Sequence, residues 1–295
     1  MGTWKTPNSY ITEVYTCSYS IYENIGCVKL FHEMGFFKNG RWDEYGKYQT
    51  LCKKCDYFIH SVGVYFGQGN YTEDIQTKET VFCYKISTQE ELLQVVSTIS
   101  KSTKVLILND VRVEDLTALN NLRELECVLI CYCPKLNTFW DFQNTPNLKV
   151  FRYTGNKYLL DITQIGEALN LEYFEMDFLT SQTNNNHVYS FGPLTKLKKL
   201  KEVVLRGVTC LDDNIDALIH IENLEKLWIS PNAFSVEAFA KFEALKFMIY
   251  NEYGIFQAED YSCPLGKGQR SFRSQQSREN FKQKYSDLMS MYKRN

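Results

Sequence analysis

The stretch Leu125–Tyr153 reads LECVLICYCPKLNTFWDFQNTPNLKVFRY, and its closely spaced cysteines raise the question of what they do. Apolar residues hold the first, fourth and sixth positions of a unit, here Leu125, Val128 and Ile130, and Cys133 holds the ninth. The same spacing returns at intervals of 21 to 29 residues, in units that begin at Ser102, Leu148, Leu171, Leu200, Leu224 and Leu245. The middle of the chain is therefore a repeat.

The fourth and sixth positions of the seven units are apolar in 14 of 14 cases. At 44% apolar usage, such agreement has a chance of roughly one in a hundred thousand. The pattern resembles that of the leucine-rich repeat family over about Ser102–Asn251. The resemblance implies an α/β fold, in which stacked turns each add one short strand to a shared parallel, concave sheet.

The unit also predicts where its cysteines lie. Side chains alternate along a strand, so the fourth and sixth positions should point into the solenoid, and the ninth should point inward after the turn. Asn, Cys or Asp holds the ninth position in four units, whereas Leu179, Val208 and Tyr253 hold it in the others. A zinc site at Cys131 and Cys133 would need more ligands, and the sequence supplies no histidine between residues 60 and 187. A structural role in the scaffold is favoured. The four polar or thiol residues are Asp110, Cys133, Asn156 and Asn232.

The chain divides into three predicted parts. Residues 1–85 do not fit the repeat and are expected to form a small α/β module or an elaborated cap, with strands in 58–71 and 80–86. Residues 86–255 form the solenoid. Residues 256–295 form a basic loop and a C-terminal capping helix, whose apolar face carries Phe281, Tyr285, Leu288 and Tyr292.

Helical segments are expected between the strands. Residues 87–100 have a helical apolar pattern, with Ser87 or Thr88 as the cap and Glu90 or Glu91 in the first turn. This helix should shield the N-terminal end of the stack. Further helix-like returns are predicted at residues 162–170, 211–223 and 234–244.

Composition narrows the classes of partner. The net charge is −2, so no global field recruits nucleic acid or an anionic membrane. No apolar run is long enough to span a bilayer, and the N-terminus lacks the apolar core of a signal peptide. Ten cysteines without such a peptide favour reduced thiols and a cytoplasmic location. No cofactor is predicted.

Two clusters are candidates for other chemistry. Cys52 and Cys55 have metal-like spacing, and Cys17, Cys27, His32 and His60 are available to complete a zinc site in the N-terminal module. Ordinary cysteines are the favoured interpretation, with redox use as a third. The segment Gly266-Lys267-Gly268, with Arg270 and Arg273, is either an anion-binding loop or, as favoured, a solvated loop before a helix.

The candidate binding surface is the outward face of the concave sheet. Stacking the strands in register places a mixed-charge cluster at its centre, apolar groups toward its ends and one large aromatic residue near the C-terminal end. Arg and Trp are frequent interface hot spots. The alternative is that these residues only pair across strands. The predicted partner-binding residues are Leu106, Leu129, Arg152, Glu175, Asp177, Arg206, Trp228 and Ile249.

The sequence favours a non-enzymatic, protein-binding repeat module, since no catalytic motif is recognisable. High Lys, Asn, Ile, Tyr and Phe usage indicates an AT-rich bacterial genome, and an inhibitory or immunity-type partner of a bacterial protein is the sharper form of this hypothesis. The alternative is an enzyme or zinc-binding protein with its chemistry in residues 1–85 and repeats that recruit substrate. A self-associating structural protein is a third hypothesis.

Overall fold

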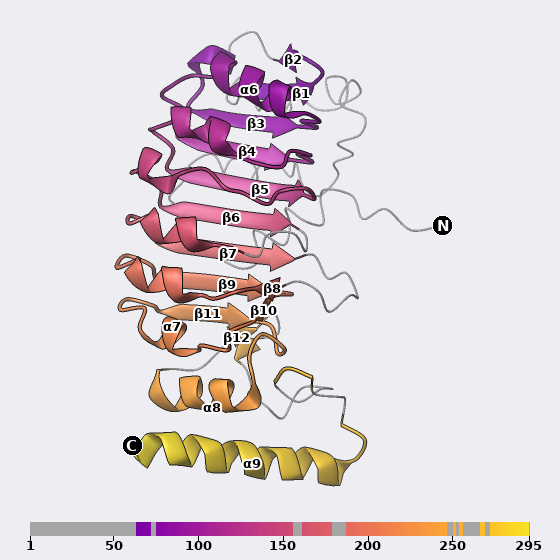
Figure 1. Ribbon diagram of the computed structural model, residues 1–295, viewed down its shortest axis with the longest axis vertical. Helices are drawn as coiled ribbons and strands as arrows, with labels where there is room; N and C mark the ends of the chain where they lie inside the picture. Colours follow the sequence, from indigo (N-terminus) through magenta and orange to yellow (C-terminus); the bar gives the residue numbers. More distant parts are fainter. Residues whose placement is uncertain are drawn as a thin grey trace.

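The computed structural model describes residues 63–71, 75–155, 161–178, 187–246, 250–251, 254–255, 266–268 and 272–294. In these ranges the chain forms a stack of short strands, each followed by a return that climbs to the next strand (Figure 1). The predicted fold class, an α/β parallel-sheet solenoid with a C-terminal helix, is confirmed.

Eleven strands of the described residues form one sheet, in the order β13-β12-β11-β9-β7-β6-β5-β4-β3-β1-β2. Neighbours from β1 and β3 through to β12 run parallel, and only the short strands β2 and β13 at the two edges are antiparallel. The bounds are β1 Gly63–Gly67, β2 Asn70–Tyr71, β3 Thr80–Tyr84, β4 Val105–Asn109, β5 Cys127–Cys133, β6 Val150–Gly155, β7 Tyr173–Phe178, β9 Glu202–Arg206, β11 Lys226–Ile229, β12 Tyr250–Asn251 and β13 Gly254–Ile255.

The register of the central strands confirms the repeat. Residues at the fourth position of successive units are ladder partners across the sheet, and all are buried in one core cluster. Each apolar side chain therefore stacks on its counterpart in the next turn, which is how a solenoid builds a continuous core. These partners are Val128, Phe151, Phe174, Val203 and Leu227.

The first unit departs from its expected register by one residue. Leu106, not Val105, pairs with Val128, and Leu108 pairs with Ile130. Leu106 was predicted to face outward, but it lies in the core cluster, and Ile107 takes the outward position beside Leu129. The physical reason is that all the residues from Val105 to Leu108 are apolar, so the sequence of this strand carries no alternation that fixes its phase.

The same shift recurs at the last unit. Trp228 pairs with Tyr250, so the residue opposite Trp228 is Tyr250 rather than the predicted Ile249, which lies outside the described residues. At the N-terminal side, β3 pairs in parallel with β4, so the sheet continues across residue 86 without a break. The proposed division of the chain at residue 85 stays a prediction.

The returns are mostly single 3-10 turns rather than full helices, because few residues separate successive strands. In a typical return, Ala168 N donates a backbone hydrogen bond to Ile165 O at 3.0 Å. Two short strands, β8 and β10, pair on this side of the stack. The bounds are η2 Ile75–Thr77, α6 Gln89–Thr98, η3 Thr117–Asn121, η4 Phe142–Asn144, η5 Thr163–Glu167, β8 His187–Val188, η6 Gly192–Lys196, β10 Thr209–Cys210, α7 Asp216–Ile219, α8 Val236–Leu245 and α9 Gln275–Arg294.

Helix α6 is held at its N-terminus as the sequence indicates. Thr88 is the cap residue, and its hydroxyl accepts a hydrogen bond from Glu91 N at 3.1 Å. The carboxylate of Glu91 accepts from Ser87 N at 2.7 Å and from Gln68 N at 2.6 Å. Glu91 therefore completes the cap and also ties the turn between β1 and β2 to the helix.

Alternating charges line the edge where the strands begin. The residue before each strand is acidic or basic in turn, and its backbone N–H donates to the preceding member of the series. Ion pairs join Lys104 to Glu79 (2.9 Å), Lys149 to Glu126 (2.7 Å) and Lys201 to Glu172 (3.1 Å). Opposite charges on neighbouring turns favour the observed stacking, although each exposed pair contributes little alone. The series is Glu79, Lys104, Glu126, Lys149, Glu172, Lys201 and Glu225.

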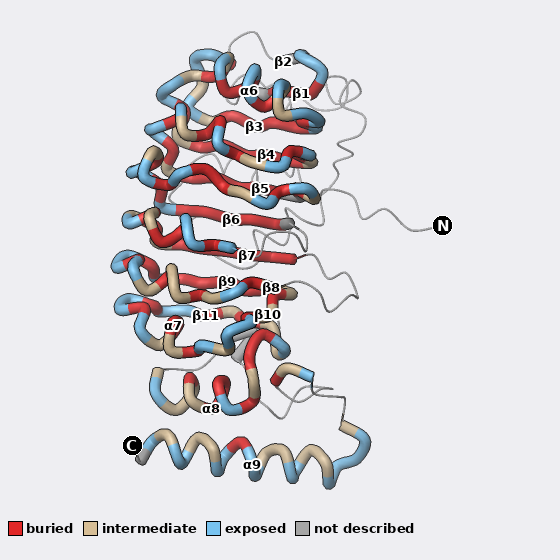
Figure 2. Tube along the Cα trace, viewed as in Figure 1, coloured by how far each residue is buried: buried red, intermediate tan, exposed pale blue. Residues whose placement is uncertain are grey.

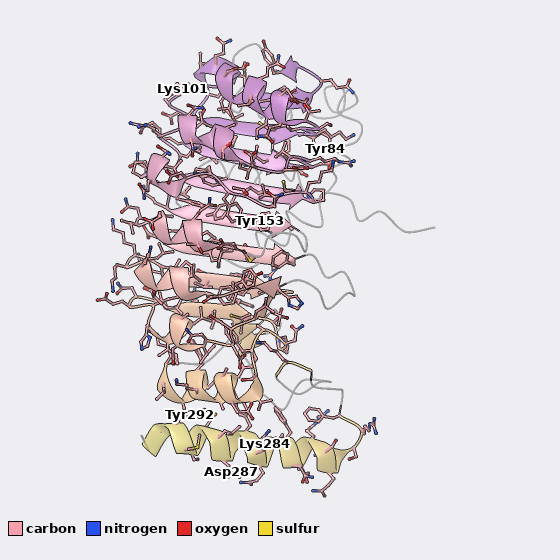
Figure 3. The ribbon with its side chains drawn as sticks, viewed as in Figure 1. Tyr84, Lys101, Tyr153, Lys284, Asp287 and Tyr292 are labelled. Atoms are coloured by element: carbon pink, nitrogen blue, oxygen red, sulfur yellow. The ribbon has the colours of Figure 1, made fainter. Side chains whose placement is uncertain are left out.

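The predicted capping helix α9 packs beside α8 at the C-terminal end of the stack (Figure 1). Tyr285 is buried between them, and Phe281 and Leu288 pack against the core as predicted, whereas Tyr292 is not among the residues that do. Lys284 Nζ lies 3.4 Å from Glu237 Oε1 of α8 (Figure 3). The helix covers apolar side chains that the last turn would otherwise expose.

Cys133, the residue that opened the question of a metal or redox site, is a core residue. Its side chain is buried, and Sγ lies 3.9 Å from Val113 O, a weak hydrogen bond. Val111 and Val208 occupy the same inward position on other turns and are equally buried. The expected inward orientation fails for Asn232, which is exposed, and for Asp110, which adopts a positive φ of 54° at a turn.

Candidate functional site

The sheet has a second face, opposite the core, which we call the outer face. Every second residue of each strand points to this face, so the side chains of neighbouring strands line up in three rows across it. The middle row contains Phe82, Ile107, Leu129, Arg152, Glu175, Val204 and Trp228. The row toward the strand starts contains Val105, Cys127, Val150, Tyr173, Glu202 and Lys226, and the row toward the strand ends contains Tyr84, Asn109, Thr154, Asp177 and Arg206.

Most of the outer face is buried. Leu129 is 5% exposed, Arg152 is 1% exposed and Val204 is 0% exposed, although none of them belongs to the core cluster. Figure 2 shows most of the described residues of the strands from β3 to β9 as buried. Strands that are apolar on both faces are typical of parallel sheets covered on both sides.

Charged side chains occupy the centre of this buried face. Arg152 Nε lies 3.5 Å from Glu175 Oε1 across the ladder between β6 and β7. Tyr173, two residues before Glu175 on the same face, donates its hydroxyl hydrogen to Glu175 Oε2 at 2.6 Å. Buried charges require such partners, because desolvation of an isolated charge is costly.

Two further ion pairs extend the cluster toward β11. Arg206 Nη1 lies 3.7 Å from Asp177 Oδ2, and Lys226 Nζ lies 3.8 Å from Glu202 Oε2. Burial raises the pKa of Glu202 to about 7, and the nearby Glu175 carboxylate adds to this effect while Lys226 opposes it. Each carboxylate of the cluster has a cation within about 4 Å, an arrangement of ion pairs rather than of an acid and a nucleophile.

Exposure increases at the C-terminal end of the outer face. Arg206 and Trp228 are partly exposed, Lys226 is exposed, and Ser230 beyond the end of β11 is partly exposed. Ser230 Oγ accepts a hydrogen bond from Gly207 N at 2.8 Å, which fixes the turn that follows Arg206. The strand pair β9 and β11 therefore presents a tryptophan and two cations beside the buried charges.

Sequence reasoning placed most of these residues together. Arg152, Glu175, Asp177 and Arg206 form the central cluster as expected, and Trp228 lies near its C-terminal end. Reasoning from the repeat missed Tyr173, Glu202 and Lys226. The signal was available, since these residues lie two positions before Glu175, Val204 and Trp228, respectively, and so share their face.

The described residues give no support to the other two candidate sites, the zinc site and the anion-binding loop. Cys52 and Cys55, with their potential co-ligands, lie outside the described residues, and among the described residues no group of His, Cys, Asp or Glu suits a metal ion. Lys267 of the basic loop pairs with Asp213 Oδ1 at 2.8 Å and also bonds Cys210 O, so it ties this loop to the solenoid. No described helix is both long and apolar enough to cross a bilayer.

No protein-family model matches the chain, and no curated protein matches it. Among solved structures, an internalin from Listeria monocytogenes is 14% identical with a TM-score of 0.36, over 60% of this chain and 56% of that one. Internalin C2 of the same species is 18% identical with a TM-score of 0.32, over 51% of this chain and 69% of that one. The chain thus spans little more than half of the first internalin. With TM-scores this low, the repeat architecture rests on the strand register.

Proposed function

We propose that this chain is a non-enzymatic repeat module that binds another protein through the accessible end of its outer face. The observation that carries the proposal is the change in exposure along this face, from the buried Arg152–Glu175 pair to the accessible Arg206, Lys226 and Trp228. Arg and Trp are enriched among residues that dominate binding energy, especially where one side of each group is already packed.

The geometry suits recognition of a folded surface with both acidic and apolar groups. Arg206 and Lys226 supply positive charge beside the indole of Trp228, and the buried carboxylates Asp177 and Glu202 hold these cations in place. Opposite charge on a partner would increase its rate of association and select against wrong partners. An inhibitory or immunity-type role toward a bacterial protein is the specific form of this proposal, with a cytoplasmic location.

The test is an affinity pull-down from the native host, followed by measurement of Kd for the captured protein. Arg206→Ala and Trp228→Ala should each weaken binding by more than about 1 kcal/mol, while circular dichroism and Tm show that the fold persists. The matched control replaces Lys198 and Glu222 by Ala, since this exposed ion pair lies on the returns, away from the outer face. Equal binding by the Arg206/Trp228 double variant and the wild type would refute the proposal.

A further inference from the structure

The tripeptide Gly266-Lys267-Gly268, which we call the strap, lies against the loop between β11 and α8. Gly266 N donates a backbone hydrogen bond to Pro231 O, and Lys267 N donates one to Phe234 O, both at 2.8 Å. Backbone bonds of this kind fix the position of a segment without any help from its side chains. The strap therefore follows the last described turn of the solenoid as if it were part of the next one.

The side chain of Lys267 reaches back to the preceding turn. Its Nζ atom lies 2.8 Å from Asp213 Oδ1 and also donates a hydrogen bond to Cys210 O. The same atom lies 6.0 Å from the centre of the Phe234 ring. A cation that is bonded to a carboxylate and placed over a ring is held in one orientation. One side chain thus joins the strap to two successive turns.

Asp213 extends this connection to the start of α8. Its Oδ1 atom also accepts a hydrogen bond from Ser235 N at 2.8 Å. Ser235 is the cap residue of α8, and its hydroxyl accepts from Ala238 N at 3.1 Å. The pair formed by Lys267 and Asp213 is therefore anchored in the groups that begin α8, the helix on which α9 packs.

The two glycines explain how the strap takes this path. Gly266 has a φ of 114° and Gly268 a φ of 69°, and both values lie in the left-handed region that other residues rarely adopt. The chain can therefore turn sharply on each side of Lys267. These turns direct both the backbone N–H and the side chain of Lys267 toward the solenoid.

Helix α9 follows the strap closely in the chain. The ring of Phe272, four residues after Gly268, lies 5.7 Å from that of Phe281 in α9, measured between centroids. The nearest described residue before the strap is Ile255 of β13, 17 residues before Phe272. The probability that a tethered segment docks falls with about the 3/2 power of the tether length. A tether of 17 residues instead of four would thus lower it roughly tenfold.

We propose that the strap is a latch that keeps α9 in place as the cap of the stack. The polar and ring contacts described for Lys267 are with Cys210, Asp213 and Phe234, and none of them is with α9. The latch therefore acts through the length of the tether rather than by touching the helix. When α9 is lifted, the apolar side of α8 becomes exposed, so the latch controls access to this end of the stack.

Hydrogen exchange of the full chain, measured by mass spectrometry, tests the latch. Lys267→Met keeps an unbranched apolar side chain but removes the charge. Amides of α9 should exchange roughly tenfold faster in this variant, whereas amides of β5, β6 and β7 should keep the rates of the wild type. Asp213→Asn retains an acceptor for Ser235 N and should have the same effect. The double variant should open α9 no more than either single one, because both changes break one contact.

The matched control is Lys284→Met, which removes the ion pair between α9 and Glu237 of α8, an exposed pair at 3.4 Å. It should change exchange of α9 by about twofold or less. Wild-type exchange of α9 in Lys267→Met would overturn the proposal, and so would an equal effect of Lys284→Met, since direct contacts would then hold the helix. Faster exchange in β5, β6 and β7 would also overturn it, because the whole fold would be loosened. The strap is separate from the outer face, so this inference and the proposed function fail independently.

Discussion

Arg152 on β6 and Glu175 on β7 are ladder partners whose Nε and Oε1 atoms lie 3.5 Å apart, with side chains 1% and 0% exposed. Both belong to the outer face rather than to the core, and Glu175 also accepts a hydrogen bond from Tyr173. The desolvation of two charges offsets most of their attraction, so the intact pair adds little to stability. Loss of one partner is different, because it leaves the other charge buried without compensation.

We therefore expect Glu175→Gln to lower the free energy of unfolding by about 3–5 kcal/mol, the usual cost of removing one partner of a buried pair. Replacing both residues by apolar ones of similar size, Arg152→Met with Glu175→Leu, should cost less than the two single changes added together. Urea unfolding at pH 7 of the wild type, Arg152→Met, Glu175→Leu and the double variant gives this coupling energy as a double-mutant cycle, and Glu175→Gln is measured beside them. Strict additivity would show that the two charges do not stabilise each other.

Glu202 should make stability depend on pH in a direction opposite to that of most carboxylates. Burial raises its pKa from an ordinary 4.5 to about 7, so the folded chain binds this proton more tightly than the unfolded chain. Its contribution is fully present below pH 4.5 and is lost as the pH rises through 7. The loss is at most about 3.4 kcal/mol, from 1.36 kcal/mol per pH unit over the 2.5 units between the two pKa values.

The measurement compares unfolding free energies of the wild type and Glu202→Gln between pH 4.5 and 8. The variant should gain stability relative to the wild type as the pH rises, because an amide keeps the neutral form that burial favours. Glu225→Gln, at an exposed position of the adjacent loop, is the control and should show no such trend. Parallel pH profiles for the wild type and Glu202→Gln would contradict the burial of an ionisable group here.

A side chain at Gly207 should destabilise the fold. Its φ of 62° lies in the left-handed region, and a Cβ atom would come within 2.4 Å of the backbone oxygen of Phe178 on the neighbouring turn. Gly69 has a φ of 79° but open space around the same position, which makes it a matched control. We expect Gly69→Ala to cost about 1–2 kcal/mol from conformation alone.

Gly207→Ala should cost a further 1–3 kcal/mol or so, because two turns of the solenoid must move apart to admit the methyl group. Thermal unfolding of both variants beside the wild type measures the difference. Similar losses at the two positions would mean that the turns adjust without strain, and that the close approach of Gly207 to Phe178 does not limit stacking.

The sequence predicted the architecture well where its strands alternate and poorly where they do not. Phe151 and Tyr153 flank Arg152 on β6, so the pattern fixes the phase of this strand, and both were placed correctly as inward residues. Leu106 was misplaced because every side chain near it is apolar, so a shift by one residue changes nothing in the pattern. The repeat thus determines the number of turns more firmly than the phase of each strand.

The candidate site was predictable in part for the same reason. Arg152 and Glu175 break the apolar run and so mark the outward positions of their strands. The burial of these charges was not predicted, because the repeat pattern shows which side chains point outward but not how exposed they are. Uniformly apolar strands such as β4 do indicate that both faces of the sheet are buried, since a solvated outer face would favour polar residues at alternate positions.

The cysteines of the repeat provide the last test, since they separate a scaffold from a reactive site. Burial raises the pKa of both Cys133 and Cys210 to about 12, so at pH 8 about one thiol in ten thousand is the reactive thiolate. Iodoacetamide should leave both unmodified in the folded chain and alkylate both in denaturing guanidinium, as peptide mapping by mass spectrometry would show. Rapid alkylation of Cys133 in a chain with an unchanged circular dichroism spectrum would mean that its position is open to solvent. The ninth position of the repeat would then be a chemical site after all.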